Sequence, residues 1–255
     1  MNTNLNGKTA VITGGARGIG LAVARSLAAE GANIALLDLL DNVAETAQEI
    51  ADKYHIQTFS QQLDVTDQDA TAAAFDAVSE RLGVPQVLLT AAGIEINGDS
   101  VDVSAREWRK VIDVNLTGTF FAAQSFGRGL LSAGLPGSAI LISSMSGSIV
   151  NVPQWAVSYN ASKAAVAHLG KSLAVEWAAA GVRVNSIAPG YVLTDLTRQI
   201  IDREPALEAD WISRIPQGRM ATPEDLTGLV SFLASDASSY LTGQEIIIDG
   251  GYTSI

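Results

Sequence analysis

Short apolar runs alternate along the chain with longer segments of helical periodicity. Most of these runs carry hydrophobic residues at successive positions, which is typical of strands covered on both faces in a parallel sheet. The predicted strands are residues 9–13, 34–39, 58–64, 86–90, 139–143, 183–187 and 245–248. The predicted helices are residues 18–29, 43–53, 67–81, 105–131, 159–180 and 223–234.

This alternation predicts an α/β class fold: a doubly wound Rossmann arrangement with a seven-stranded parallel sheet and helices on both faces. No repeat, low-complexity tract or flexible linker divides the sequence, so we expect a single domain over residues 1–255. Residues 193–218 interrupt the alternation, because they are polar, hold Pro205, Trp211 and Pro216, and contain no predicted strand. Long insertions of this kind often form binding loops or lids, and we expect this segment, as a loop or helix, to cover the substrate.

The composition narrows the classes of partner. The chain has 255 residues, with 16 Lys and Arg against 27 Asp and Glu, and a net charge of −11. Such a surface repels nucleic acids and anionic membranes, so neither is an expected partner. The absence of cysteine excludes disulfides, thiolate metal sites and a cysteine nucleophile.

Neither histidine suggests a metal site or a catalytic role. His168 lies about half a helical turn out of phase with Tyr159, and His55 lies at a polar helix end, so no metal is predicted. Residues 1–7 are polar and lack the pattern of a signal peptide, and no apolar run reaches membrane-spanning length. We therefore expect a cytoplasmic protein.

A glycine-rich turn lies between the first predicted strand and the first helix. Its sequence is Gly14-Gly15-Ala16-Arg17-Gly18-Ile19-Gly20. Glycines let the backbone turn sharply and let a pyrophosphate approach it, and the helix N-terminus offers unpaired N–H groups. An ordinary glycine-rich turn is the alternative, but the position between strand and helix favours a dinucleotide site.

Asp38 ends the second predicted strand, where a carboxylate can accept hydrogen bonds from the ribose hydroxyls of an adenosine. Its negative charge would also repel a 2′-phosphate, which favours NAD over NADP. The alternative is that Asp38 is only a turn residue at the strand end.

Tyr159 and Lys163 are four residues apart near the start of a predicted helix, so they share one face. The ordinary tyrosine pKa of about 10 is too high for a general base near neutrality. A nearby ammonium and the charge of an oxidised nicotinamide would lower it. A surface Tyr–Lys pair is the alternative; against it, Ser143 and Ser144 end the fifth strand, where doubly wound sheets bind ligands.

Together these segments resemble the short-chain dehydrogenase/reductase family. The glycines fit its Thr-Gly-x-x-x-Gly-x-Gly pattern from Thr13, and further motifs follow in the family order as far as Gly251. The resemblance implies an enzyme that moves a hydride between NAD(P) and a secondary alcohol or its ketone. The cofactor contacts that the turn, Asp38 and the resemblance together predict are Gly14, Arg17, Gly18, Ile19, Gly20, Asp38, Asp64, Val65, Ala92, Gly93, Tyr159, Lys163, Pro189, Gly190, Val192 and Thr194.

Two of these positions leave alternatives open. Some NADP-using relatives carry a basic residue at the position of Arg17, which opposes the argument from Asp38. We expect NAD, because a flexible arginine hardly offsets repulsion at contact distance. Asp64 fits an adenine-contacting pair with Val65 but could equally cap the approach to the next helix.

The chain departs from the family pattern after the fourth strand. The family often has Asn-Asn-Ala-Gly there, and this chain has Thr90-Ala91-Ala92-Gly93. Ala92 and Gly93 keep the close backbone approach, but the two side-chain amides and any bracing that they provide are missing.

The resemblance also assigns catalytic roles. It implies that Ser144 hydrogen-bonds the substrate oxygen, Tyr159 exchanges its proton, Lys163 binds ribose, and Asn115 helps to hold a water of a proton relay. Ser146 is the rival serine, because it stands thirteen residues before Tyr159, the commoner spacing. Ser144 stands three residues before Gly147, as the family serine usually does, and is therefore preferred.

The loop over residues 146–155 resembles that of polyol dehydrogenases of the galactitol type and of ketose reductases. The candidate substrate contacts are Ser146, Asn151, Gln154, Trp155, Tyr191 and Trp211, and simple loop packing is the alternative for several of them. We therefore expect a sugar alcohol or ketose as the small-molecule substrate. A 3-oxoacyl or general ketone reductase and a catalytically silent nucleotide sensor are the competing functions. The resemblance further implies an oligomer, and we expect a homotetramer.

Overall fold

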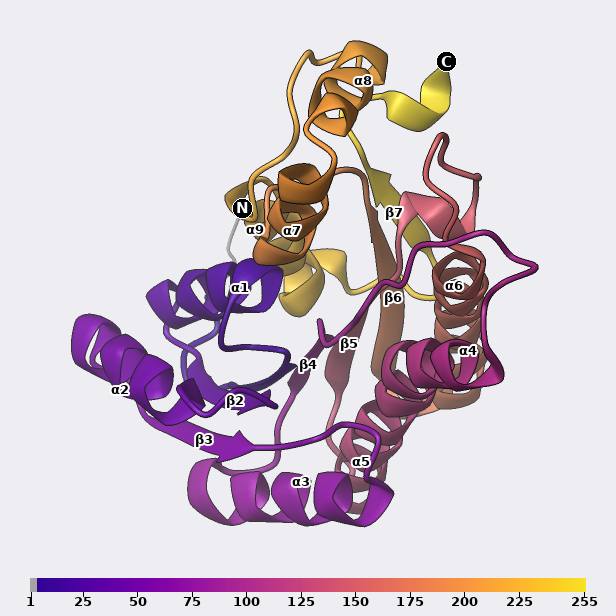
Figure 1. Cartoon of the computed structure of the whole chain (residues 1–255). Coiled ribbons are helices and arrows are strands. Elements are labelled where there is room, and N and C mark those ends of the chain that lie inside the picture. The colour runs from indigo at the N-terminus through magenta and orange to yellow at the C-terminus, as the bar shows by residue number, and fades with distance from the viewer. Residues whose placement is uncertain (1–3) are drawn as a thin grey trace.

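The computed structural model describes residues 4–255 and contains one seven-stranded sheet (Figure 1). All strand pairs are parallel, in the order β3-β2-β1-β4-β5-β6-β7. The strands are β1 Thr9–Thr13, β2 Asn33–Asp38, β3 Thr58–Gln62, β4 Val87–Thr90, β5 Gly137–Ile142, β6 Val182–Pro189 and β7 Glu245–Ile248. The predicted fold class is confirmed, and each predicted strand overlaps an observed one.

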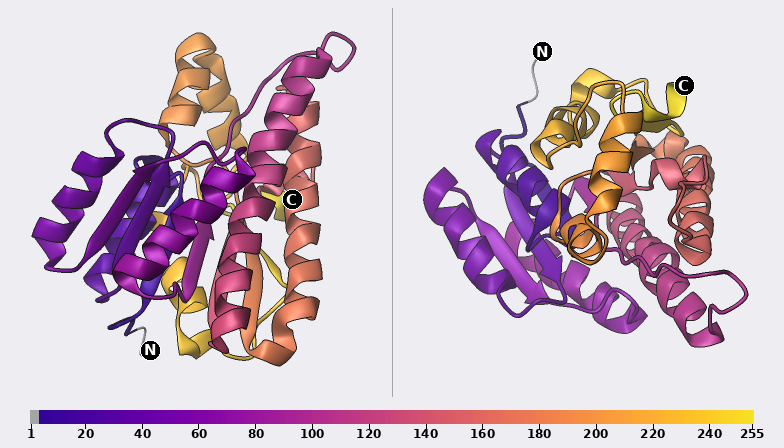
Figure 2. Two further views of the ribbon diagram at one scale, coloured as in Figure 1. Left: turned by 90° about the horizontal axis from the view of Figure 1, so that it is seen from below. Right: turned by 45° about the horizontal axis from the view of Figure 1, so that its top comes forward.

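Helices cover both faces of the sheet (Figure 2). The helices are α1 Gly18–Ala29, α2 Val43–Tyr54, α3 Gln68–Leu82, α4 Ala105–Ile112, α5 Gly118–Ala133, α6 Val157–Trp177, α7 Asp195–Arg203, α8 Ala206–Arg214 and α9 Glu224–Ala234. One hydrophobic cluster joins α1, α2 and α9 to the sheet, and a second joins α3, α5 and α6 to the other face.

Successive residues of the central strands enter opposite clusters, which explains why the strands are apolar throughout. Ile12 of β1 packs in the first cluster and Val11 in the second, and both are fully buried. The edge strands β3 and β7 are only half-buried, because each has a neighbour on one side. The register leaves the carboxyl ends of β1, β4, β5 and β6 together at one edge of the sheet, where the candidate site lies.

Two predicted segments differ from the structure. The predicted helix 105–131 is interrupted by a π-helical segment, Asp113–Thr117, between α4 and α5. Residues 193–218 are not irregular but hold the short helices α7 and α8, which lie above the carboxyl edge of the sheet (Figure 1). A third cluster ties this segment to the site; it comprises Met145, Tyr191, Leu207, Trp211, Ile215 and Met220.

None of the helices in residues 4–255 is long and apolar enough to cross a membrane. Within the same residues, no group of three or more His, Asp or Glu side chains is placed to hold a metal ion. His55 follows α2 and His168 lies on the exposed side of α6, as predicted. The prediction that residues 1–7 are not a signal peptide falls partly on residues 1–3, which lie outside the described chain.

Candidate functional site

The glycine turn after β1 is tightly packed against the segment after β4. Gly14 has φ +67° and donates its N–H to the Leu37 carbonyl at 2.8 Å. A Cβ on Gly14 would lie 2.6 Å from the Ala92 nitrogen, and one on Gly20 would lie 2.1 Å from the Gly14 carbonyl oxygen. Only glycine fits at these two positions, and the turn delivers the free N–H groups of α1 to the carboxyl edge, which suits a pyrophosphate.

Asp38 holds the chain next to this turn. Its carboxylate accepts hydrogen bonds from the Ala16 N–H at 2.9 Å and from the Leu40 N–H at 3.0 Å, and the residue is 8% exposed. The neighbouring Arg17 is exposed. A fixed carboxylate at the end of β2 has acceptor capacity left for ribose hydroxyls, so these residues fit a dinucleotide.

The remaining predicted cofactor residues lie along the same edge. Asp64 accepts hydrogen bonds from the N–H and hydroxyl of Thr66, at 2.9 and 2.8 Å, so its carboxylate shapes a turn, while Asp67 caps α3. Val65 is buried under Gly118, where a Cβ would lie 2.6 Å from it. Ile19, Pro189, Gly190, Val192 and Thr194 line the pocket described below, and Thr194 caps α7.

Tyr159 and Lys163, in the first turns of α6, share one face as predicted. The Lys163 ammonium donates to the Ile142 carbonyl at 2.8 Å and lies 5.6 Å from the centroid of the Tyr159 ring. The Ser144 side chain is hydrogen-bonded to Tyr159. The rival Ser146 instead donates its hydroxyl to Asn151 Oδ1 at 2.8 Å, and its N–H to Ser144 Oγ at 3.1 Å. The structure thus brings Ser144, Tyr159 and Lys163 together, with Ser146 beside them.

The pKa of Tyr159 shifts against the prediction when the chain is taken alone. Burial raises it, the negative charge of Glu95 raises it further, and the hydrogen bond with Ser144 opposes them. Lys163 is buried beside it, and burial lowers the pKa of Lys163 to about 8, against the opposing charge of Glu95. Tyr159 is therefore a neutral phenol near neutrality in the chain alone.

Asn115 lies in the π-helical segment and is fully buried. Its Oδ1 accepts from the Ile94 N–H at 2.8 Å, and its Nδ2 donates to the Ile94 carbonyl at 2.9 Å and to Ser162 Oγ at 3.0 Å. A Cβ on Gly93 would lie 3.4 Å from Asn115 Oδ1 and 3.6 Å from Lys163 Nζ. The Asn115 amide thus fixes the segment after β4, where this chain lacks the two family asparagines.

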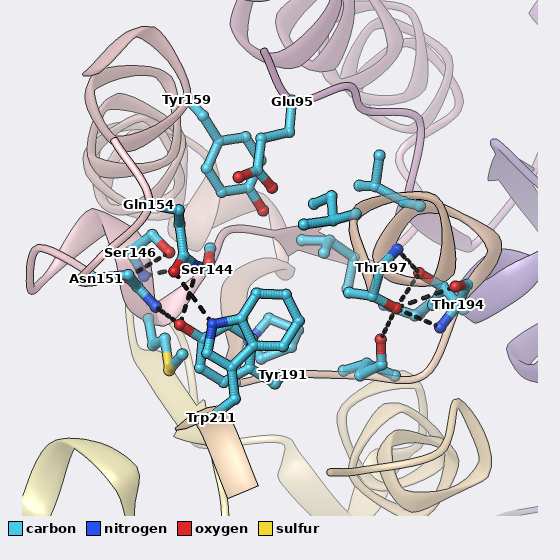
Figure 3. Close-up of a pocket in the computed structure, with 18 of the residues that line it drawn as sticks. Glu95, Ser144, Ser146, Asn151, Gln154, Tyr159, Tyr191, Thr194, Thr197 and Trp211 are labelled. Atoms are coloured by element: carbon cyan, nitrogen blue, oxygen red, sulfur yellow. Dashed lines mark hydrogen bonds between the residues drawn. The ribbon is translucent and has the colours of Figure 1, made fainter. Parts of the chain in front are cut away.

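Glu95 is a candidate site residue that the sequence analysis missed. It follows β4 by five positions, is half-buried, and lines the same pocket as Ser144 and Tyr159. Figure 3 shows its carboxylate next to the Tyr159 hydroxyl. Burial raises the pKa of Glu95 to about 7, while a hydrogen bond with Asn97 and the charge of Lys163 lower it. The sequence did carry a signal for this residue: Glu95 is an acid between two isoleucines, Ile94 and Ile96, shortly after a buried strand.

The pocket lies beside Tyr159 (Figure 3), and α7 and α8 contribute Leu196, Thr197, Ile200 and Trp211 to its lining. Five of the six predicted substrate residues line it, namely Ser146, Asn151, Gln154, Tyr191 and Trp211. Trp155 does not; it is 50% exposed, and its backbone carbonyl accepts a hydrogen bond from the Gly98 N–H. The prediction of Trp155 as a pocket wall is not met in the chain alone.

A hydrogen-bond network ties the helical cover to the serine loop. The Tyr191 hydroxyl accepts from Asn151 Nδ2 and from Gln154 Nε2, both at 2.9 Å. Gln154 Oε1 accepts from Trp211 Nε1 at 3.1 Å, and the Trp211 ring stacks on Tyr191 with centroids 4.2 Å apart. This wall of the pocket is therefore polar and joined by hydrogen bonds, which suits a hydroxylated ligand.

Comparison with known proteins places this site in a family. The family model described as enoyl-(acyl carrier protein) reductase matches residues 14–253. The galactitol 2-dehydrogenase (L-tagatose-forming) of Cereibacter sphaeroides is 42% identical, over 98% of this chain and 96% of its own length. The D-arabinitol 2-dehydrogenase (ribulose-forming) of Candida tropicalis is 40% identical, over 97% of this chain and 93% of its own.

The fold gives the same result. The crystal structure of a short-chain type dehydrogenase/reductase from Mycobacterium marinum superposes with a TM-score of 0.94, at 41% identity, covering 99% of this chain and 98% of that one. The chain belongs to the short-chain dehydrogenase/reductase family and is an NAD(P)-dependent oxidoreductase.

Proposed function

We propose that this protein interconverts a sugar alcohol and its ketose with NAD(H) as the hydride carrier. The observation that carries the proposal is the convergence of the Ser144 and Tyr159 hydroxyls, with Lys163 close by, at a pocket that is lined by several hydrogen-bonding side chains and one carboxylate, Glu95. The similarity to galactitol and arabinitol dehydrogenases supports a polyol as substrate.

The bound nicotinamide would supply the hydride acceptor for oxidation and the hydride donor for reduction. Tyr159 holds the proton that the substrate oxygen exchanges. In ketone reduction its neutral hydroxyl donates that proton to the developing alkoxide, and in alcohol oxidation its phenolate accepts the alcohol proton. Ser144, hydrogen-bonded to Tyr159, orients the same oxygen.

Lys163 and Asn115 support Tyr159 in this scheme. Lys163 is anchored to the Ile142 carbonyl and keeps its charge through neutral pH, since its pKa is about 8. There it is placed to bind a ribose hydroxyl and to stabilise the phenolate. The water relay predicted for Asn115 is part of this proposal. The backbone carbonyl of Asn115 accepts a hydrogen bond from the Thr119 hydroxyl at 2.7 Å.

Asp38 supports NAD over NADP. Its carboxylate is immobilised by two backbone N–H groups, so it cannot swing away from a 2′-phosphate. Arg17 is exposed and free of such constraints, and its opposing effect is expected to be smaller. We further infer that α7 and α8 cover the substrate, and that the chain is a single-domain subunit of a cytoplasmic homotetramer.

The direct test is to follow NAD⁺ and NADP⁺ reduction with arabinitol, galactitol and simple secondary alcohols, and NADH oxidation with the matching ketoses. The proposal predicts fast NAD-linked conversion of a polyol or ketose. Reduction of 3-oxoacyl thioesters without conversion of any polyol or ketose would replace it with the competing ketone reductase function. Binding of NAD without turnover of any of these compounds would favour the nucleotide sensor.

A further inference from the structure

Glu95 is held at the pocket, beside the Tyr159 hydroxyl (Figure 3). The preceding residue, Ile94, has both backbone groups bonded to the buried Asn115 amide. The backbone next to Glu95 is therefore fixed, and the Glu95 carboxylate lies beside the Tyr159 hydroxyl (Figure 3). Any substrate oxygen bound by Ser144 and Tyr159 lies next to it.

The pocket contains no cation to balance this acid. Among the pocket-lining residues in the described part of the chain, Glu95 is the one carboxylate, and none is Lys, Arg or His. The charge of Lys163 acts on Glu95 from outside this lining, and Asn97 donates one hydrogen bond. A carboxylate can accept about four hydrogen bonds, so acceptor capacity remains for a ligand in the pocket.

Burying an acid in part costs free energy of folding unless a partner or ligand forms hydrogen bonds with it. Burial raises the pKa of Glu95 to about 7, so the group is partly ionised near neutrality. Opposite it, Asn151, Gln154 and Tyr191 are engaged with one another and Trp211. Glu95 is thus a hydrogen-bond acceptor in the pocket that takes no part in that network.

We propose that Glu95 determines substrate class: its carboxylate accepts a hydrogen bond from the hydroxyl on the carbon next to the reacting carbinol, and it repels substrates that carry their own carboxylate. The inference rests on the proposed function, because it presumes that Tyr159 and Ser144 hold the reacting oxygen. It names the class as neutral vicinal polyols and excludes sugar acids.

Three small substrates that share a secondary alcohol separate these effects. They are 2-butanol, 2,3-butanediol and 3-hydroxybutyrate, assayed for kcat/KM in wild type, Glu95→Gln and Glu95→Ala. Because hydrogen bonds to charged groups are strong, we expect the diol-to-butanol ratio to fall about tenfold or more in Glu95→Ala and less in Glu95→Gln, which keeps a carbonyl acceptor. Activity toward 3-hydroxybutyrate relative to 2-butanol should rise about tenfold in both variants.

Glu80→Gln is the matched control, because Glu80 is exposed at the end of α3. It should leave all three ratios unchanged. If the Glu95 variants change all three substrates equally, the specificity role is overturned while the proposed function stands. If wild type oxidises simple alcohols but no sugar alcohol, the proposed polyol function fails. The diol-to-butanol and hydroxybutyrate-to-butanol ratios then still test the specificity role of Glu95. No turnover in either direction would overturn both.

Discussion

Asn115 binds the backbone of Ile94 through both ends of its amide, with Oδ1 accepting at 2.8 Å and Nδ2 donating at 2.9 Å. The pair connects the π-helical segment between α4 and α5 to the chain that follows β4. In this way one buried side chain braces the segment that carries Glu95.

Replacing Asn115 by Ala should therefore destabilise the protein and impair catalysis together. The change leaves the partly buried N–H and carbonyl of Ile94 without their Asn115 partners, at a cost of about 2–4 kcal/mol in the free energy of unfolding. Urea unfolding measures this cost. Ser162→Ala is the control, because it keeps both Ile94 contacts. It removes the third hydrogen bond of the amide and the bond from the Ser162 hydroxyl to the Tyr159 carbonyl, and it should cost about 1 kcal/mol. Equal costs for the two variants would show that the Ile94 contacts contribute little.

Asp38 should set the choice of cofactor. Asp38→Asn removes the charge that opposes a 2′-phosphate, and we expect the ratio of kcat/KM for NAD⁺ over NADP⁺ to fall about tenfold or more. Steady-state kinetics with both cofactors measures it. Arg17→Ser is the complementary variant, which should raise the same ratio by a smaller factor. A wild type that prefers NADP⁺ would contradict the argument from Asp38.

The sheet could be predicted from sequence because its central strands are apolar on both faces. Ile12 and Val11, for example, pack on opposite faces of the sheet, and both are fully buried. The glycine turn could be predicted because Gly14 and Gly20 admit no Cβ. The bounds of helices α7 and α8 were not predicted, because short helices with polar outer faces carry a weak periodic signal and depend on packing around Trp211.

The chemistry of the site was predicted less completely than its residues. Ser144, Tyr159 and Lys163 are recognisable by their order and spacing. The sign of the Tyr159 pKa shift depends on burial and on Glu95, a charge from another strand end, and neither is visible in a local motif. Trp155 illustrates the converse, because a loop sequence does not say which side chains turn inward.

The role of Glu95 should depend on pH. With a pKa of about 7, Glu95 gains charge as the pH rises, so the diol-to-butanol ratio of kcat/KM should rise between about pH 6 and 8. The other titratable groups that face it, Tyr159 and Lys163 on α6, act on both substrates and cancel in the ratio. In Glu95→Gln the ratio should be flat. A ratio that rises equally in the variant would assign the titration to another group.

Glu95 should also cost the protein stability at alkaline pH. Its pKa is raised in the folded state, so the unfolded chain ionises first, and the folded state loses stability as the pH rises from about 4.5 through 7. After allowance for its partial exposure, Glu95→Gln should be more stable than wild type by about 1–2 kcal/mol at pH 8 and equal to it near pH 4. Urea unfolding at both pH values checks this, and Glu80→Gln should show no such difference. A Glu95→Gln protein less stable at pH 8 would contradict the prediction.

The central claim, that Tyr159 exchanges the proton of the reacting oxygen, is tested most directly by Tyr159→Phe. The ring and its packing remain, and only the hydroxyl beside Ser144 is lost. We expect the rate of NAD⁺-linked polyol oxidation to fall by about 10²–10⁴-fold or more, with NADH affinity unchanged in a fluorescence titration. A variant that binds NADH normally and turns over within a few-fold of wild type would contradict the account.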